Sequence, residues 1–171
     1  MIEPDTKDWT WVLDRPCPEC GFDAAEVPLD EIAPRILENA ATWPVIVMYA
    51  DAAVRPAPNV WSPLEYACHV RDVYRVMASR LRLMLDRDNP EFANWDQDAT
   101  AEQEHYSEQD PARVAEELTT AAEELAGLFD SVGDAQWERP GRRSNGSLFT
   151  VASLGRYTLH DVVHHLVDVE G

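Results

Sequence analysis

Four long stretches with the apolar period of an α-helix constrain the fold of this chain more than any other feature. They span residues 29–53, 63–87, 111–129 and 150–169. Apolar side chains recur in them every three or four residues, which is typical of helices that bury one face. Helix starts are marked by a capping box of Ser62 and Glu65 around Pro63, and by Asp110 before another proline. Pro44 should kink or break the first helix. The pattern predicts an all-α fold, an antiparallel four-helix bundle.

The remaining segments carry no comparable period. Residues 1–28 are rich in proline and are predicted to form an irregular arm in front of a bundle domain at 29–171. The stretches 89–110 and 134–148 read as long polar loops, and a loop that long in a compact domain is usually functional or mobile. No segment shows sustained strand alternation, apart from short pieces in the arm.

The net charge and the composition exclude some classes of binding partner. The formal net charge is −18 and the pI is about 4.4, which argues against binding the phosphates of nucleic acids and against docking on anionic membranes. No apolar run is long enough to span a membrane, and the N-terminus does not resemble a signal peptide. Three cysteines do not make a disulfide framework. We therefore expect a cytoplasmic protein whose partner is a small molecule, and a homodimer is compatible with the exposed faces of a bundle.

Three histidines are placed to meet in such a bundle. His160 and His164 are four residues apart, so their imidazoles lie one turn apart on one face of the last helix. His69 lies near the start of the second helix, which is close to the end of the last helix if the two run antiparallel. Three histidines around a divalent ion leave one position open, as in catalytic zinc sites. The alternative is that these are core or surface histidines with hydrogen-bond partners.

Two runs of the sequence resemble a known family. The run WSPLEYACHVRDVYRVMASRL and the terminal TLHDVVHHLVDV are similar to the DinB-like superfamily of four-helix metalloproteins, over about residues 29–169. That superfamily includes thiol S-transferases and mycothiol-dependent maleylpyruvate isomerases. The resemblance implies a divalent metal, zinc or nickel, held by His69, His160 and His164. Many members continue the last motif with Gly-Gln where this chain has Leu166 and Val167.

Three further residues lie near the expected ligands. Asp72 is three residues after His69 and is predicted either to orient a ligand imidazole or to be a surface charge paired with Arg75. His165 points about 100° away from the ligand face, so it is expected to support or pack beside the ligands. It could replace His164 if the register differs. Tyr157 is expected in the core, with the wall of a pocket as its alternative.

The arm contains a second motif with potential metal ligands, a C-x-x-C sequence. Cys17 and Cys20 have the spacing of half a zinc knuckle, but a structural zinc needs four ligands. Metal binding with borrowed ligands, redox or disulfide chemistry, and no special chemistry all remain open for this pair. Cys68 is expected to be a core residue.

The basic run at Arg139, Arg142 and Arg143 stands out in an acidic chain. It is expected to be a solvated loop, with an anion-binding role as the alternative.

Together these features predict a divalent-metal-binding protein. The leading interpretation is a metal-dependent enzyme such as a low-molecular-weight-thiol S-transferase of the mycothiol type, with zinc or nickel and a thiol as cofactors. The alternatives are a non-catalytic, stress-related bundle that binds a metal or ligand, and a metal-dependent hydrolase. No H-E-x-x-H motif is present, which argues against a zincin-type protease.

Overall fold

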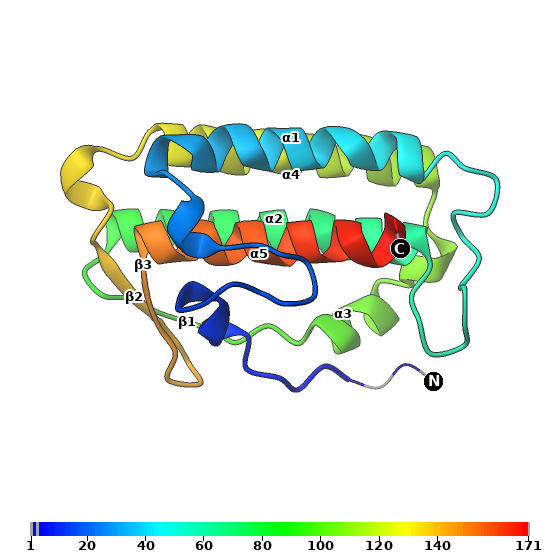
Figure 1. Cartoon of the computed structure of the whole chain (residues 1–171), viewed down its shortest axis with the longest axis horizontal. Coiled ribbons are helices and arrows are strands. Elements are labelled where there is room, and N and C mark those ends of the chain that lie inside the picture. Colours follow the sequence, from blue (N-terminus) through cyan, green and yellow to red (C-terminus); the bar gives the residue numbers. More distant parts are fainter. Residues whose placement is uncertain (1, 3, 171) are drawn as a thin grey trace.

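The computed structural model describes residues 2 and 4–170, and its main feature is a four-helix bundle, as predicted (Figure 1). The bundle helices are α1 (Ile32–Ile46), α2 (Pro63–Asp86), α4 (Pro111–Asp130) and α5 (Val151–Glu170). A short helix, α3 (Gln97–Gln103), lies outside the bundle. None of the helices in the described part of the chain has the length and apolarity that crossing a membrane would require.

The four helices form a ring in which α4 packs on α1 and α2, and α5 packs on the other side of the same two helices. In Figure 1, α1 and α5 run in one direction, and α2 and α4 run in the other. The neighbours α2 and α5 are therefore antiparallel, as the sequence predicted, whereas α2 and α4 are parallel. The start of α2 consequently lies beside the end of α5.

Buried hydrogen bonds fix these helices against each other. Asn39 on α1 donates from Nδ2 to the carbonyl of Val162 on α5, at 3.0 Å. Its Oδ1 accepts from the indole of Trp43 and from the hydroxyl of Tyr74 on α2, both at 3.1 Å. Because an unpaired buried amide costs about 1–3 kcal/mol, one asparagine links three helices in a defined register.

Helix ends follow the local signals in the sequence. Ser62 accepts from the amide of Glu65, and the Glu65 carboxylate accepts from the amide of Ser62, which completes the predicted capping box of α2. Asp110 caps α4 by accepting from Arg113 N–H at 2.8 Å. The first helix is shorter than predicted: a 3₁₀ turn covers Leu29–Glu31, and α1 ends at Ile46 rather than near residue 53. Pro44 removes one backbone donor, and the helix ends within its next turn.

The long polar stretch 89–110 is a return connection. Because α2 and α4 are parallel, the chain must travel back along the bundle before α4 can begin (Figure 1). On the way it forms β1 (Glu91–Phe92), α3 and a 3₁₀ turn, Tyr106–Glu108. Its length therefore follows from the helix directions.

A small sheet closes one end of the molecule. Strand β2 (Pro140–Arg143) pairs in parallel with β1 and antiparallel with β3 (Leu148–Thr150). The interpretation of residues 134–148 as a loop is corrected here, because these strands have two to four residues and are too short to show alternation.

The arm is folded against α5 rather than extended from the bundle. It contains two 3₁₀ turns, Thr10–Leu13 and Ala24–Glu26, and both contact α5. Val12 and Val27 are fully buried, and Arg156 of α5 donates to the carbonyl of Val27 at 3.0 Å. In Figure 1 the arm crosses the outer side of α5, so this helix is covered by the bundle on one side and by the arm on the other.

Candidate metal centre

Helix α5 carries two overlapping pairs of ligand-type side chains, each spaced by four residues. His160 and His164 form one pair, and Asp161 and His165 form the other. Since one residue turns an α-helix by about 100°, the two pairs face different surroundings. Among the described residues, the side chains able to hold a metal form two groups, and each contains one of these pairs.

The first group joins the second pair to α2. Donor atoms of His69, Asp161 and His165 all lie within 4.8 Å of one another. Asp161 Oδ1 is 3.5 Å from Nε2 of His69 and 3.6 Å from Nε2 of His165. The two imidazoles meet edge to face, with ring centroids 4.7 Å apart. All three donors thus converge from two antiparallel helices.

Unpartnered buried atoms show that this group fits a cation. Both ring nitrogens of His69 and Oδ1 of Asp161 are buried without a hydrogen-bond partner among the described residues. Such atoms are rare in folded proteins because each costs about 1–3 kcal/mol, more when the group is charged. Two imidazoles and a carboxylate are a common ligand set for divalent metals. A bound cation would satisfy these atoms together.

Acidic side chains orient the group and add to its attraction for cations. His165 Nδ1 lies 2.9 Å from Asp168 Oδ2, which leaves Nε2 directed at Asp161. This is the arrangement in which a carboxylate orients a metal-binding histidine. Burial opposes a charge on His165, but the hydrogen bond to Asp168 and the nearby carboxylates outweigh it and raise the pKa of the imidazole. The same negative field favours a bound cation.

The environments of the other two donors keep them in ligating forms. Burial would raise the pKa of Asp161, but His69 and His165 outweigh it and lower the pKa, so the carboxylate is ionised. For His69, burial dominates and lowers the pKa, which keeps the imidazole neutral. Its ring stacks on Trp95 with centroids 5.4 Å apart and 6° between planes, and Trp61 packs on it at 5.4 Å. The two indoles close this side of the group to solvent.

The opposite side opens into a cavity of about 310 Å³. The His69 side chain is fully buried, whereas those of Asp161 and His165 are 23% and 18% exposed and line the cavity. Other walls come from the arm, the connections at 47–62 and 89–110, and the bundle helices: Asp5, Lys7, Trp9, Glu19, Trp61, Tyr66, Asp98, Tyr157, His160, His164 and Asp168. A ligand in this cavity could therefore approach the side chains of Asp161 and His165, while Oδ1 of Asp161 is itself buried.

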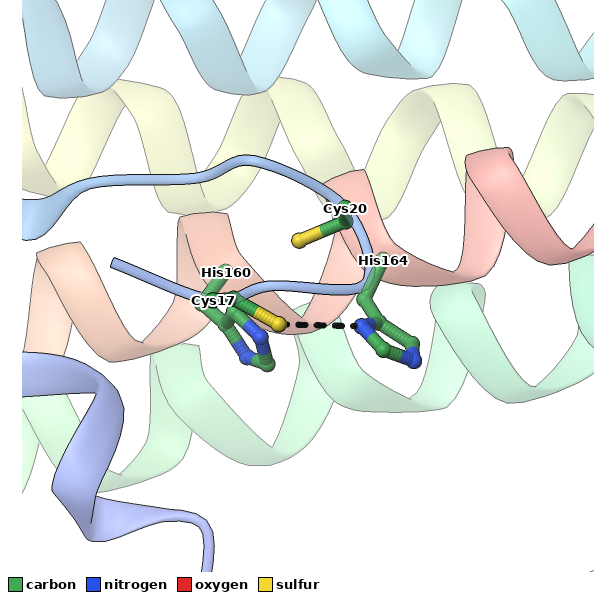
Figure 2. Close-up of side chains that lie close together, drawn as sticks. All are labelled: Cys17, Cys20, His160 and His164. Carbon is green, nitrogen blue, oxygen red and sulfur yellow. Dashed lines mark hydrogen bonds between the residues drawn. The ribbon is translucent and has the colours of Figure 1, made fainter. Parts of the chain in front are cut away.

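The second group contains the first pair of α5 and the two cysteines of the arm. Figure 2 shows Cys17, Cys20, His160 and His164 side by side. Their donor atoms lie within 4.8 Å of one another, and Cys17 Sγ is 3.8 Å from His164 Nδ1. Burial, helped by His164, lowers the pKa of His160 to about 4, so its imidazole is neutral. Trp9 covers both imidazoles, with ring centroids at 5.5 and 5.2 Å.

The predicted trio of His69, His160 and His164 is thus divided between the two groups. His69 faces Asp161 and His165, while His160 and His164 face the cysteines. His165 was expected to support or pack beside the ligands, with replacement of His164 as its alternative, and its Nε2 is directed into the first group. Asp161 was not singled out as a candidate ligand, although its spacing of four residues from His165 is the same signal that singled out His160 and His164.

Asp72 lies in a different network from the one expected. Its carboxylate accepts from Arg71 at 2.9 and 3.1 Å, from the Tyr106 hydroxyl at 2.6 Å and from Arg75 at 3.2 Å. Since both nitrogens of His69 are unpartnered, Asp72 does not orient that imidazole through a hydrogen bond. The predicted pairing with Arg75 is present, but the carboxylate is largely buried and mainly ties α2 to the segment before α4.

Other singled-out residues have structural surroundings. Tyr157 lines the cavity while its ring packs edge-on against Phe149 at 5.4 Å. Cys68 is buried near the carbonyl of Tyr106, as expected of a core cysteine.

The basic run forms part of the small sheet and its approach. Arg139 donates to the carbonyls of Met84 and Arg87 at the end of α2, and Arg142 donates to the carbonyl of Asn89. Arg143 donates to Asn145 and Ser147. Arg139 thus holds this segment to the end of α2, whereas Arg142 and Arg143 bond within the sheet region, and none of the three lines the cavity in the described part of the chain.

Comparisons with known proteins agree with this architecture. No curated protein matched the chain. A solved structure, YfiT from Bacillus subtilis, is similar with a TM-score of 0.72 and 20% sequence identity, covering 81% of this chain and 82% of that one. YfiT is described as a probable metal-dependent hydrolase with an unusual four-helix bundle topology. The model of the DinB superfamily matches residues 49–168, which include α2, α4, most of α5 and all three donors of the first group. The chain therefore belongs to the DinB superfamily.

Proposed function

We propose that this protein is a metal-dependent hydrolytic enzyme whose divalent ion is held by His69, Asp161 and His165. The observation that carries the proposal is the set of unpartnered buried donors, which opens on one side into the cavity. Two histidines and one carboxylate, with a further position left open, are the ligands of several zinc hydrolases. The description of the structurally similar YfiT as a probable metal-dependent hydrolase supports the same class.

When bound, a divalent ion supplies a Lewis acid and lowers the pKa of a coordinated water or thiol. The chain's own side chains prepare the place where this occurs. Asp168 holds His165 in the orientation that directs Nε2 at the group. Trp61 and Trp95 exclude water from the His69 side, so access is confined to the cavity.

The walls of the cavity indicate the substrate class. Besides Asp161, the cavity is lined by four carboxylates and one lysine, Lys7. The carboxylates are those of Asp5, Glu19, Asp98 and Asp168. Such a field raises the local concentration of cations and repels anions. Aromatic rings supply the apolar part of the wall. We infer a neutral or cationic substrate with an apolar portion, in preference to a dianionic one.

Thiol S-transfer is the second candidate. It is favoured by the extent of the cavity, about 310 Å³, which reaches from Asp161 and His165 to Trp9 and Trp61 and leaves room for both a thiol and an electrophile. The hydrolytic proposal requires only water as the second reactant. The two candidates therefore differ in whether turnover depends on an added thiol.

Purified protein loaded with Zn²⁺ or Ni²⁺ tests both. We expect hydrolysis of neutral p-nitrophenyl esters without thiol, abolished in His165→Ala and in Asp161→Asn. His105→Asn is the matched control, because His105 is exposed and lies outside both groups. Turnover of 1-chloro-2,4-dinitrobenzene only with an added thiol would favour S-transfer instead. Retention of the full metal content in a His69→Ala, Asp161→Ala, His165→Ala triple variant would contradict the assigned site.

A further inference from the structure

We propose that the chain holds a second metal ion, a structural zinc, through Cys17, Cys20, His160 and His164. This site is separate from the one assigned above and does not depend on the proposed function. It joins the arm to α5, and two of its ligands come from outside residues 49–168, the part of the chain that matches the superfamily.

The distances in the group suit a tetrahedral ion. Zinc bonds of about 2.3 Å to sulfur and 2.0 Å to nitrogen place neighbouring donors roughly 3.6 Å apart. The separation of 3.8 Å between Cys17 Sγ and His164 Nδ1 is close to that value, and every other pair of donors lies within 4.8 Å. Only small side-chain adjustments are needed for four donors to share one ion.

The backbone of the arm brings both sulfurs to the same side. Gly21 donates to the carbonyl of Cys17 at 2.8 Å, and Cys17 donates to the carbonyl of Phe22 at 2.8 Å, which closes a tight turn around the cysteines. Gly21 has φ of +76°, a conformation that L side chains rarely adopt. Figure 2 shows the resulting loop over α5, with both thiols facing the two imidazoles.

An unpartnered nitrogen again points to a ligand. Nε2 of His160 is buried without a hydrogen-bond partner in the described part of the chain, and the residue is only 4% exposed. Cys17 is 1% exposed and has a free thiol. Two thiolates and two neutral imidazoles carry a charge of about −2, which a Zn²⁺ ion cancels, so the complex can be buried without a net charge.

The donor set also indicates the kind of ion and its role. A tetrahedral set of two sulfurs and two nitrogens is typical of zinc, with all four positions filled by protein, as in structural sites. The first group has three donors beside the cavity, whereas the second has four, although its His160 and His164 also line that cavity. Its ion would hold the turn of the arm against α5, and that arm supplies Trp9 and Glu19 to the wall of the cavity.

Metal counting on the full chain tests the proposal. We expect two equivalents of zinc in the wild-type protein and one in a Cys17→Ser, Cys20→Ser variant. Cys68→Ser is the matched control, since Cys68 is a buried free cysteine outside the group, and it should retain both ions. The His69→Ala, His165→Ala variant should lose the other ion and keep this one, so failure of either site can be recognised separately. An unchanged zinc content in the double cysteine variant would overturn the proposal.

Spectroscopy gives a measurement that does not depend on a cysteine variant folding. In the His69→Ala, His165→Ala variant loaded with Co²⁺, we expect thiolate-to-cobalt charge-transfer absorption and the strong visible bands of a tetrahedral site. X-ray absorption of the zinc form should show two sulfur and two nitrogen neighbours. A shell of nitrogen and oxygen alone, or a Cys17–Cys20 disulfide in zinc-free protein purified under reducing conditions, would refute it.

Discussion

Replacement of Asp72 by asparagine separates a structural role from a metal-orienting role. The carboxylate forms a paired contact with Arg71, whose side chain is 4% exposed, and the Asp72 side chain is itself 12% exposed. The amide of the substituted side chain would place its hydrogens against the donors of the guanidinium. Breaking a buried pair by removing one partner costs about 3–5 kcal/mol. Arg71 keeps Glu117 and Gln109 as partners, so we expect a smaller loss, roughly 2–4 kcal/mol of unfolding free energy.

Urea unfolding of chelator-treated protein at pH 7 measures this loss. Arg75→Gln is the matched control, because that side chain is 47% exposed and its pair with Asp72 should be worth less than about 1 kcal/mol. Zinc content should be unchanged in both variants. A loss below about 1 kcal/mol for Asp72→Asn, or a loss of metal without a loss of stability, would refute the structural role.

The same pair gives a pH dependence of defined sign. Burial would raise the pKa of Asp72, but the hydrogen bonds from Arg71 and Tyr106 outweigh it, and the folded pKa is lowered. A lowered carboxyl pKa contributes stability above the unfolded value of about 3.9, and this contribution is lost as the pH falls through the folded pKa. The difference in unfolding free energy between the wild type and Asp72→Asn should therefore shrink as the pH falls below about 4. A difference that stays constant over this range would contradict the assignment.

Three further variants test the fold. Ser62→Ala should cost about 1 kcal/mol by removing the cap of α2, measured by thermal unfolding, and an unchanged midpoint would contradict the capping role. Glu65→Gln should make the unfolding free energy depend less on pH under acid conditions. Burial would raise the pKa of Glu65, but the hydrogen bonds from Arg55 and Ser62 outweigh burial and lower the pKa. The stabilisation by the Glu65 carboxylate is therefore lost as the pH falls below about 4.3. Gly155→Val should cost about 1–3 kcal/mol in urea unfolding, because even its Cβ would meet core atoms at 2.9 and 3.0 Å. In the control Gly127→Ala, where nothing lies within 4 Å, stability should rise by roughly 0.5–1 kcal/mol; equal effects at the two glycines would refute the packing argument.

The helices could be predicted from sequence because their signals are local. Apolar period and caps fixed the starts of α2 and α4 to the residue, since Ser62 and Asp110 act within one turn of their own helices. The end of α1 was placed too late, because the apolar side chains after Pro44 continue the helical pattern while the backbone does not. Strand β1 was missed because it pairs with β2 about 50 residues later, and the hairpin of β2 and β3 was missed because its strands are too short to show alternation.

The ligand groups could be predicted only in part. Spacing identified His160 and His164 as a pair, and antiparallel packing brought His69 beside α5. The face of α5 that meets α2 depends on the rotation of α5 about its axis. A rotation of about 100°, equal to one residue, decides whether His164 or His165 faces His69. The path of the arm was equally hidden, so Cys17 and Cys20 lacked partners until the fold placed them on α5.

The two overlapping pairs on α5 have a consequence for the motion of that helix. An ion held on a single face would restrain the helix in one direction only, in addition to the packing of α5 on α1 and α2. With an ion in each proposed site, the attachments would point in directions about 100° apart within little more than one turn, one to α2 and the other to the arm. Rotation that relaxed one would strain the other. With both ions bound, the angle at which Asp161 and His165 face the cavity would be fixed from two sides.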